Sequence, residues 1–425
     1  MGTTLTRPDL LEGAERVGFR DGRDWLLSPE PFRLEGAELE RIERMGHPLR
    51  MFQEACGRIY RRSVNGSLPG WIAELLDAGK PAWMVEAQRS DALREAAPRV
   101  IRPDLLLTDD GLALTELDAV PGGMGVTGWL AEHYAAAGFE ILGEGMLDGF
   151  RRVMPGGGQI LISEEAGDYR AEMQWLADAL SNAGGGPWWV GSAEEFSGGN
   201  GPLYRFFELF DWEAVPESRH LAERADVTPP FMPHFEEKLW LALFWSPALQ
   251  EVWREELRGN HLQRMREMIP YGWVVDPAPL PPHAAFPRLE VNNWGQVADF
   301  SQKARRLVLK ISGFNELAWG SRGVVIGHDT SGDEWAAALE RACAEFDSQP
   351  WLMQEFREAK LVEHPYFDPA GGAVKTMRGR VRLCPYYFVD DDQATHLGGC
   401  LAAIVPADKK KIHGMRDAIL VPCSG

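Results

Sequence analysis

Cysteine is scarce in this sequence, and its five residues are scattered: Cys56, Cys343, Cys384, Cys400 and Cys423. None belongs to a C-x-x-C pair, so neither a disulfide framework nor a zinc site is expected, and a reducing compartment is favoured. No apolar run is long enough to span a bilayer, and the N-terminus lacks the basic and apolar segments of a secretory signal. We therefore expect a cytoplasmic protein without a membrane partner.

Positive charge is also in short supply, because 44 Lys and Arg residues face 63 Asp and Glu residues, for a net charge of −19. Such a balance argues against binding to nucleic acid or to an anionic membrane surface. A nucleotide site would need a local basic patch within an acidic surface. The length of 425 residues allows two or three domains, and the hydrophobic fraction of 45% is ordinary for a globular protein.

Two short strands joined by the turn Asp109-Asp110-Gly111 are predicted near residue 110. The first runs from Asp104 to Thr108, and the second ends in Glu116 and Asp118. Side chains two positions apart share a strand face, and the turn folds Asp104 back towards the other two acids. Three converging carboxylates are typical of a site for a hard cation such as Mg²⁺, although a solvated acidic hairpin is the alternative.

Glycines follow this hairpin in the pattern Gly123-x-Gly125-x-x-Gly128, ahead of a helix predicted over Trp129 to Ala137. The pattern matches a dinucleotide-binding fingerprint. The acids that end the preceding strand would repel a pyrophosphate, and the next strand candidate, Phe139 to Leu142, is not followed by a clear ribose-binding acid. A dinucleotide-dependent oxidoreductase therefore remains an alternative reading of these glycines.

The middle of the chain has the pattern of a β-α-β unit. A strand is predicted over Gln159–Ser163, a helix begins at Asp168, and the run Gly184–Gly186 ends it before a strand over Trp188–Val190. Such a unit is the core of a small parallel-sheet domain.

Helical spacing dominates residues 1–100, which suggests a supporting helical layer. We expect three domains: residues 1–130 with this layer and the acidic hairpin, residues 131–230 with the β-α-β unit, and residues 231–425 with further helices and a nucleotide-binding half.

The nucleotide-binding half is predicted from a strand, a glycine loop and a second strand. Lys310 lies near the end of the strand Arg306–Ser312, and the next strand is Val324–Ile326. Glycine loops can face phosphates with backbone N–H groups, and a strand lysine adds a positive charge. The candidate phosphate ligands are Lys310, Gly313, Gly320, Ser321 and Gly323. A surface hairpin with an exposed lysine is the alternative.

Two further strands complete this half. The first, Pro350–Phe356, carries the candidate nucleotide ligands Gln354 and Glu355. In the second, a period of two places Arg378, Arg380 and Arg382 on one face. Three aligned arginines in an acidic protein favour contact with polyphosphate over a solvated face, because arginine suits phosphate geometry, and Arg380 is taken as the ligand.

The order of these features resembles that of the circularly permuted ATP-grasp enzymes, the branch of glutathionylspermidine synthetase and its relatives. The resemblance is carried by Arg102-Pro-Asp104 and Glu116-Leu-Asp118, in which Asp104 and Glu116 lie twelve positions apart (116 − 104). That family has Arg-x-Asp on one strand and Glu-x-Asn on the next, so Asp118 replaces an asparagine. In ordinary ATP-grasp chains such acids come last, whereas here they precede the lysine and glycine loop.

The resemblance implies an α/β (α+β) ATP-grasp fold, circularly permuted, with a helical N-terminal layer and a small parallel-sheet domain before the grasp. It implies ATP and Mg²⁺ as cofactors, Asp104, Glu116 and Asp118 as metal ligands, and Arg102 as the catalytic residue. Lys310 would contact phosphates, the loop Gly313–Gly323 would act as a lid, and Glu355 would lie beside adenine. A second ATP-binding lysine is not evident, although Lys303 could replace it.

The expected activity is ligation of a small-molecule carboxylate to an amine or thiol, with release of ADP and through an acyl-phosphate. The alternatives are a non-catalytic ATP-binding protein, the oxidoreductase reading of Gly123 to Gly128, and a kinase on the same scaffold. The two substrates and the oligomeric state are left open.

Overall fold

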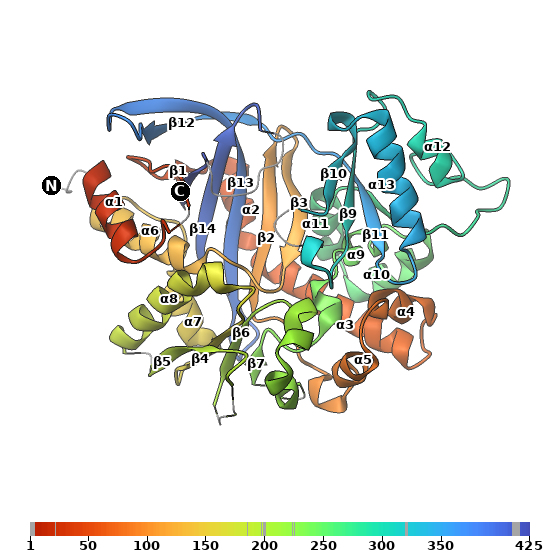
Figure 1. The fold of residues 1–425 in the computed structure, drawn as a ribbon, viewed down its shortest axis with the longest axis horizontal. Coiled ribbons are helices and arrows are strands. Elements are labelled where there is room, and N and C mark those ends of the chain that lie inside the picture. The colour runs from red at the N-terminus through yellow and green to blue at the C-terminus, as the bar shows by residue number, and fades with distance from the viewer. Residues whose placement is uncertain are drawn as a thin grey trace. The chain divides into compact units, whose positions relative to one another are not determined.

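The computed structural model describes residues 5–21, 23–184, 186–196, 198, 201–222, 224, 226–318, 322–409 and 417–425. The fold is mixed α/β and separates into two compact units (Figure 1). Unit 1 contains Met1–Gln53, Ala92–Phe231 and Glu358–Gly425, and unit 2 contains Glu54–Asp91 and Met232–Arg357. Both units are discontinuous in the sequence, whereas the three domains expected above are contiguous, and that division stays a prediction.

Unit 1 is built on a seven-stranded sheet with the order β1-β15-β14-β13-β2-β3, in which β12 also pairs with β13. All of its pairs are antiparallel except β1 with β15. Its strands are β1 (Phe32–Arg33), β2 (Val100–Thr108), β3 (Gly111–Asp118), β12 (Leu361–Phe367), β13 (Val374–Val389), β14 (Thr395–Pro406) and β15 (Ile419–Ser424). The long strands β13 and β2 lie side by side, next to β3 (Figure 1).

Burial alternates along β13 because its sequence alternates. Val381 and Leu383 are fully buried, whereas Arg378 is exposed and Arg380 and Arg382 are partly buried on the other face. The predicted period of two is therefore confirmed, and one face of the sheet centre is polar.

A second sheet of unit 1 is parallel, with the order β5-β4-β6-β7. Its strands are β4 (Gly158–Ile162), β5 (Trp188–Ser192), β6 (Leu203–Phe206) and β7 (Val227–Thr228). Helix α8 (Arg170–Asn182) connects β4 to β5 and buries Met173, Leu176, Ala177 and Leu180, the apolar spacing of one helix face. The predicted β-α-β unit is confirmed.

The other helices of unit 1 are α1 (Arg7–Arg16), α2 (Gly36–Arg44), α6 (Met124–Ala136) and α7 (Met146–Val153). The run Phe139 to Leu142, expected as a strand candidate, does not form one. Glycines at positive φ flank it, Gly138 at 95° and Gly143 at 103°, and Leu142 donates its N–H to the Cys423 carbonyl at 2.9 Å. The backbone turns at both glycines, so residues 139–142 do not pair with another strand in a hydrogen-bonded ladder.

Unit 2 contains a four-stranded antiparallel sheet with the order β10-β9-β11-β8. The strands are β8 (Gly272–Val274), β9 (Leu307–Ile311), β10 (Val324–Ile326) and β11 (Trp351–Glu355). The helices are α4 (Trp71–Asp77), α5 (Ala82–Gln88), α9 (Leu239–Leu243), α10 (Gln250–Glu256), α11 (Asn260–Met268), α12 (Trp294–Ala298) and α13 (Gly332–Ala344). Helix α3 (Gly46–Val64) contains the division between the units.

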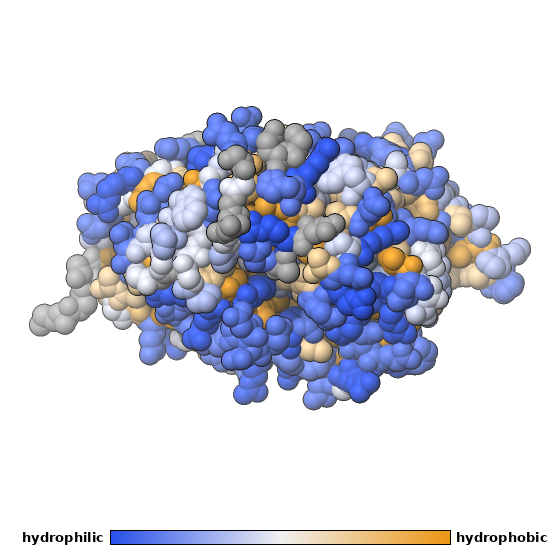
Figure 2. Space-filling model, turned by 90° about the horizontal axis from the view of Figure 1, so that it is seen from below, coloured by the Kyte–Doolittle hydropathy of each residue, from blue (hydrophilic) through white to orange (hydrophobic). Residues whose placement is uncertain are grey.

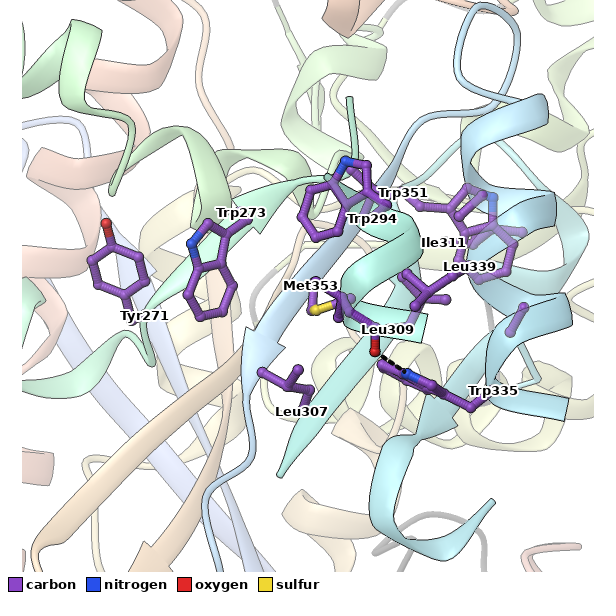
Figure 3. Packing of buried hydrophobic residues seen from close by; sticks show 14 residues of the cluster. Tyr271, Trp273, Trp294, Leu307, Leu309, Ile311, Trp335, Leu339, Trp351 and Met353 are labelled. Carbon is purple, nitrogen blue, oxygen red and sulfur yellow. Dashed lines mark hydrogen bonds between the residues drawn. The ribbon is translucent and has the colours of Figure 1, made fainter. Parts of the chain in front are cut away.

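The core of unit 2 is aromatic and lies between the sheet and helices α12 and α13 (Figure 3). Trp335, which is fully buried, donates its indole N–H to the Val297 carbonyl at 3.0 Å and so satisfies its one polar atom. Helix α13 starts with a capping box, in which Ser331 and Glu334 satisfy each other's backbone N–H groups. This packing fixes β9 and β11, which carry the predicted nucleotide ligands Lys310, Gln354 and Glu355.

No helix in the described parts of the chain combines the length and apolar character needed to cross a membrane. The face drawn in Figure 2 is mostly hydrophilic, with apolar side chains gathered in separate small areas.

Candidate functional site

The acidic hairpin predicted from the sequence forms in unit 1. Strands β2 and β3 meet at a turn over Asp109 and Asp110, and their register places Arg102 opposite Asp118 and Asp104 opposite Glu116. A bulge follows Asp104, where the Thr115 hydroxyl donates to the Asp104 carbonyl at 3.1 Å. The bulge adds one residue to β3, so all four charged side chains keep one face.

Asp104 is the buried centre of this face, with 3% of its surface exposed. Its Oδ1 lies 3.1 Å from Arg102 Nε, and its Oδ2 accepts a hydrogen bond from Arg382 Nη1 at 2.7 Å. The Cys384 thiol also donates to Oδ1 at 3.4 Å. Two guanidinium groups therefore compensate the charge of a carboxylate that would be costly to bury alone.

Arg102 connects Asp104 to the end of β3. Its Nη2 donates to Asp118 Oδ2 at 2.6 Å, and its Nη1 donates to the Gly122 carbonyl at 2.9 Å. Asp118 Oδ1 accepts the Val120 N–H at 2.9 Å. Burial raises the pKa of Asp118 above its ordinary value, and the neighbouring Arg102 charge opposes that shift. Burial would lower the pKa of Arg102, but Asp104 and Asp118 raise it well above its usual range.

The arrangement of the acids bears on the predicted metal site. Among the described residues, no three His, Cys, Asp or Glu side chains are grouped so that they could hold a metal ion together. Asp104 and Asp118 engage Arg102 instead. Because Mg²⁺ in nucleotide sites takes one or two carboxylates together with phosphate oxygens, a site completed by a nucleotide would not need a third ligand in advance. Asp104, Glu116 and Asp118 stay predicted ligands.

The three arginines of β13 share a face but have different partners. Arg382 contacts Asp104, whereas Arg380 donates to the Ala407 carbonyl and lies 4.0 Å from Glu358. Arg378 is exposed. Arg380, the predicted nucleotide ligand, therefore does not contact the hairpin acids through any of these bonds.

Three residues of β13 beside the hairpin were not assigned to the site from the sequence. Arg382 and Cys384 contact Asp104, and the Tyr386 hydroxyl donates to the Gly122 carbonyl at 2.6 Å. Burial raises the pKa of Cys384 to about 12, so the thiol stays protonated. The period of two that aligned the arginines continues through all three residues, and following it would have found them.

In unit 2, Lys310 and Gln354 form a buried polar pair. Lys310 lies on β9 opposite Leu352 of β11, and its Nζ donates to Gln354 Oε1 at 2.9 Å. Only 8% of Lys310 and 2% of Gln354 are exposed. The Gln354 Nε2 is buried without a hydrogen-bond partner. The structure thus brings these two predicted ligands together and leaves one amide donor available to an acceptor.

Glu355 ends β11 and is held by two arginines. Its Oε1 accepts from Arg288 at 2.8 Å and its Oε2 from Arg357 at 3.2 Å. The Arg288 guanidinium also lies 4.4 Å from the centre of the Tyr271 ring, and the Tyr271 carbonyl accepts the Glu355 N–H at 2.8 Å. Two arginines and the backbone of Tyr271 therefore hold Glu355 at the end of β11.

The glycine loop after β9 is anchored at both ends. Gly313 lies so close to Glu236 and Glu237 that a Cβ would come within 2.7 Å of the Glu236 carbonyl oxygen. Gly323 accepts the Ile311 N–H at 3.2 Å. Of the predicted loop ligands, Gly320 and Ser321 lie outside the described residues.

A buried ion pair supports the start of this loop. Lys80 Nζ lies 2.5 Å from Glu237 Oε1, with side chains 1% and 3% exposed, and the Ser312 hydroxyl donates to the same carboxylate. Lys238 donates to the Ala318 carbonyl at 3.0 Å, whereas Lys303, the suggested second ATP-binding lysine, is exposed in the turn before β9. Lys303 therefore lacks the buried setting of Lys310.

The glycine fingerprint has a packing role in this structure. Gly123 caps α6 at a φ of 82°, and a Cβ on Gly125 would come within 2.5 Å of the Glu172 carbonyl oxygen in α8. A Cβ on Gly128 would meet the Trp175 ring at 2.9 Å. Helices α6 and α8 can approach this closely only because the side chains are absent.

The start of α6 already faces a carboxylate of this chain. Glu172 Oε2 accepts the Val126 N–H at 3.4 Å, and Arg23 lies 3.0 Å from Glu172 Oε1. Burial raises the pKa of Glu172, while Arg23 and these hydrogen bonds lower it. Strand β3, ahead of the glycines, belongs to the antiparallel sheet, and the next strand, β4, belongs to the other sheet. The segment is therefore not the β-α-β unit that a dinucleotide fingerprint requires.

Comparison with solved structures shows a shared fold. One similar structure is a glutathione synthetase-like effector (GSS30) from Globodera pallida, in its apo form. The alignment covers 99% of this chain and 98% of the effector chain, with a TM-score of 0.55 and 12% sequence identity. A protein from Methylobacillus flagellatus provisionally named gamma-glutamylcysteine synthetase covers 83% of this chain and 87% of its own, with a TM-score of 0.38 and 12% identity. No protein-family model and no curated protein matches the sequence. The likeness to the effector structure, at 12% identity, concerns the fold alone.

Replacing Gly125 by alanine tests the packing role of the fingerprint. An alanine gains about 1 kcal/mol of helix propensity, but its Cβ meets the α8 backbone, so we expect a net loss of about 2–3 kcal/mol in the free energy of unfolding. Gly156→Ala, with no atom within 4 Å of the added Cβ, is the control and should change stability by less than about 0.5 kcal/mol. Unchanged stability together with lost NAD(H) binding would restore the dinucleotide reading.

Replacing Arg102 by alanine tests the buried charge network. The variant leaves Asp104 and Asp118 with one fewer cation, so we expect a loss of about 2–4 kcal/mol near pH 7, moderated by the partial exposure of Asp118. The folded pKa of Asp118 already lies above its ordinary value and rises further without Arg102. Stability contributed by such a group is present at acid pH and is lost as pH rises through the folded pKa. The difference from the parent protein should therefore grow as pH rises above about 4, the ordinary pKa of an aspartate, and through the raised folded pKa of Asp118.

Denaturant unfolding at several pH values measures this difference. Arg102→Lys, which keeps the charge, is the control and should recover part of the loss. A pH-independent difference, or none, would show that the network does not carry this stability.

Proposed function

We propose that the protein is an ADP-forming, ATP-dependent ligase that joins a small-molecule carboxylate to an amine or thiol. The observation that carries the proposal is the buried arrangement of Arg102, Asp104, Asp118 and Arg382 on the neighbouring strands β13, β2 and β3 of the large sheet. The shared fold with a glutathione synthetase-like effector supports it, as do the buried pair Lys310–Gln354 and the glycine loop of unit 2. The circularly permuted ATP-grasp assignment belongs to the same proposal.

The residues of unit 1 suit Mg²⁺, and those of unit 2 suit a nucleotide and its phosphates. In unit 1, Asp104, Glu116 and Asp118 offer the hard oxygen ligands that Mg²⁺ prefers, and the Nε of Arg382 is buried without a hydrogen-bond partner. In unit 2, the orphaned Gln354 Nε2 and the buried Lys310 ammonium suit a nucleotide and its phosphates. Bound Mg²⁺ would supply charge neutralisation at the β- and γ-phosphates.

In the proposed reaction, a carboxylate oxygen of the substrate attacks the γ-phosphorus and ADP leaves, giving an acyl-phosphate. The amine then attacks the acyl carbon, and inorganic phosphate leaves as the amide forms. Arg102 stabilises charge on the transferring group, because preorganised cations act most strongly where charge develops. Arg382 holds Asp104 in place, and it does so from a different strand. Lys310 contacts the phosphates.

Among the alternatives, the oxidoreductase loses its support, because Glu172 and α8 fill the space at the fingerprint glycines. A kinase and a non-catalytic ATP-binding protein are separated from a ligase by product analysis. A ligase releases phosphate and a coupled product, a kinase leaves a phosphorylated substrate, and a non-catalytic protein forms no ADP beyond the background.

The first test is isothermal titration of the full chain with ATP, ADP and NAD⁺, each with Mg²⁺ and with chelator. We expect ATP to bind about tenfold or more tightly with Mg²⁺, since the acids of the hairpin would otherwise repel the phosphates. If ATP binds equally tightly with Mg²⁺ and with chelator, Asp104, Glu116 and Asp118 are not metal ligands. A protein that binds NAD⁺ and does not bind ATP would overturn the proposal.

Lys310→Met removes the charge of Lys310 and keeps most of its buried stem. Because a hydrogen bond to a charged group contributes about 1.5–3 kcal/mol, ATP affinity should fall about 10- to 100-fold, measured by the same titration. Lys375→Met, at an exposed β13 lysine paired with Asp368, is the matched control and should leave ATP affinity unchanged. Equal affinities in the two variants would contradict a phosphate contact at Lys310.

A further inference from the structure

Unit 2 contains a pocket that none of the predicted nucleotide ligands lines. Its volume is about 650 Å³, within the range of small-molecule sites. Six aromatic side chains form much of its wall: Trp71, Trp245, Tyr271, Trp273, Phe286 and Phe346. Tyr271 and Trp273 lie side by side at one end of the aromatic core, with ring centres 5.0 Å apart (Figure 3). The pocket therefore continues the core outward as an open aromatic surface.

The charges of the pocket are all negative. Glu74, Asp276 and Asp347 line it, and no Lys, Arg or His is among the described residues of its wall. None of the three acids forms an ion pair with a basic side chain in the described part of the chain. A ligand with a positive charge would therefore meet carboxylates that form no ion pair with any described basic side chain.

The aromatic rings of this wall already accept a cation. The Arg288 guanidinium lies 4.4 Å from the Tyr271 ring centre and 5.9 Å from that of Trp245, and Glu355 holds it there. Aromatic faces attract cations through their quadrupole, and the attraction increases when the cation is partly desolvated. Two rings of the pocket are thus electrostatically suited to a positive group.

The backbone of β8 adds hydrogen-bonding groups to the pocket wall. Tyr271 and Val275 hydrogen-bond to Glu355 and Trp351 of β11, so by the alternation of an antiparallel ladder Gly272 and Val274 direct their N–H and C=O groups to the free edge. Both residues line the pocket. A protonated amine can donate to such carbonyls while its apolar body contacts the rings.

We propose that this pocket binds a small organic cation, a protonated amine carried on an apolar body. The inference does not depend on the ligase proposal, because none of the residues predicted to bind ATP or metal lines this pocket. The acidic net charge of the chain alone would place carboxylates anywhere on the surface, but it would not gather three of them in the lining of an aromatic cavity where no described basic residue lines the wall.

The test is calorimetric titration of the full chain, without nucleotide, with 2-phenylethylamine, 2-phenylethanol and 3-phenylpropanoate. These probes share a ring and a short chain and differ in charge. We expect the amine to bind about 5- to 10-fold more tightly than the alcohol, and the carboxylate most weakly. Equal affinity for amine and alcohol, or no amine binding below about 10 mM, would overturn the proposal.

A matched pair of variants locates the site. Combining Glu74→Gln, Asp276→Asn and Asp347→Asn should reduce amine affinity about 5-fold or more and leave the affinity for the alcohol unchanged. The control combines Asp299→Asn, Asp333→Asn and Glu340→Gln, exposed acids of unit 2 outside the pocket that change the net charge equally. An equal loss of amine affinity in the control would show attraction by net charge instead of a site.

Discussion

The burial of Asp104 is the constraint on which the neighbouring strands β13, β2 and β3 of the large sheet depend. A carboxylate with 3% exposure is tolerable only with compensating charge, and it receives that charge from two neighbours, Arg102 on its own strand and Arg382 on β13. Arg102 extends the network to Asp118 on β3. Three strands, β13, β2 and β3, are therefore joined by charge as well as by their ladders. Loss of either arginine removes one of the two cations that compensate Asp104.

Features that depend on neighbours in the sequence could be predicted. The hairpin at Asp109-Asp110-Gly111, the period of two in β13 and the β-α-β unit each arise from local periodicity and turn residues, and the structure contains all three. Lys310 was identified from its place on a strand before a glycine loop. Its buried partner Gln354 comes from a strand whose pairing with β9 the sequence does not specify.

Features that depend on distant residues could not be predicted in the same way. Arg382 is 278 positions from Asp104, and no local pattern states that β13 pairs with β2. Glu172, which faces the start of α6, is 46 positions from Val126, so the glycine fingerprint could not be recognised as a helix contact. In both cases the sequence does not say which distant group contacts the residue in question. Only the tertiary structure shows that Arg382 lies beside Asp104 and that Glu172 lies beside the start of α6.

The interleaving of the two units has a consequence for the order in which the protein can assemble during synthesis. Strands β2 and β3 belong to the second segment of unit 1, whereas β13, β14 and β15 belong to its last segment, after Arg357. While the chain is elongating, the acidic hairpin thus exists without its neighbour β13, and Asp104 must remain hydrated until Arg382 has been made. Unit 2 is complete in sequence before unit 1 is, so the acids of the hairpin can meet Arg382 only after the last segment of unit 1 has been synthesised.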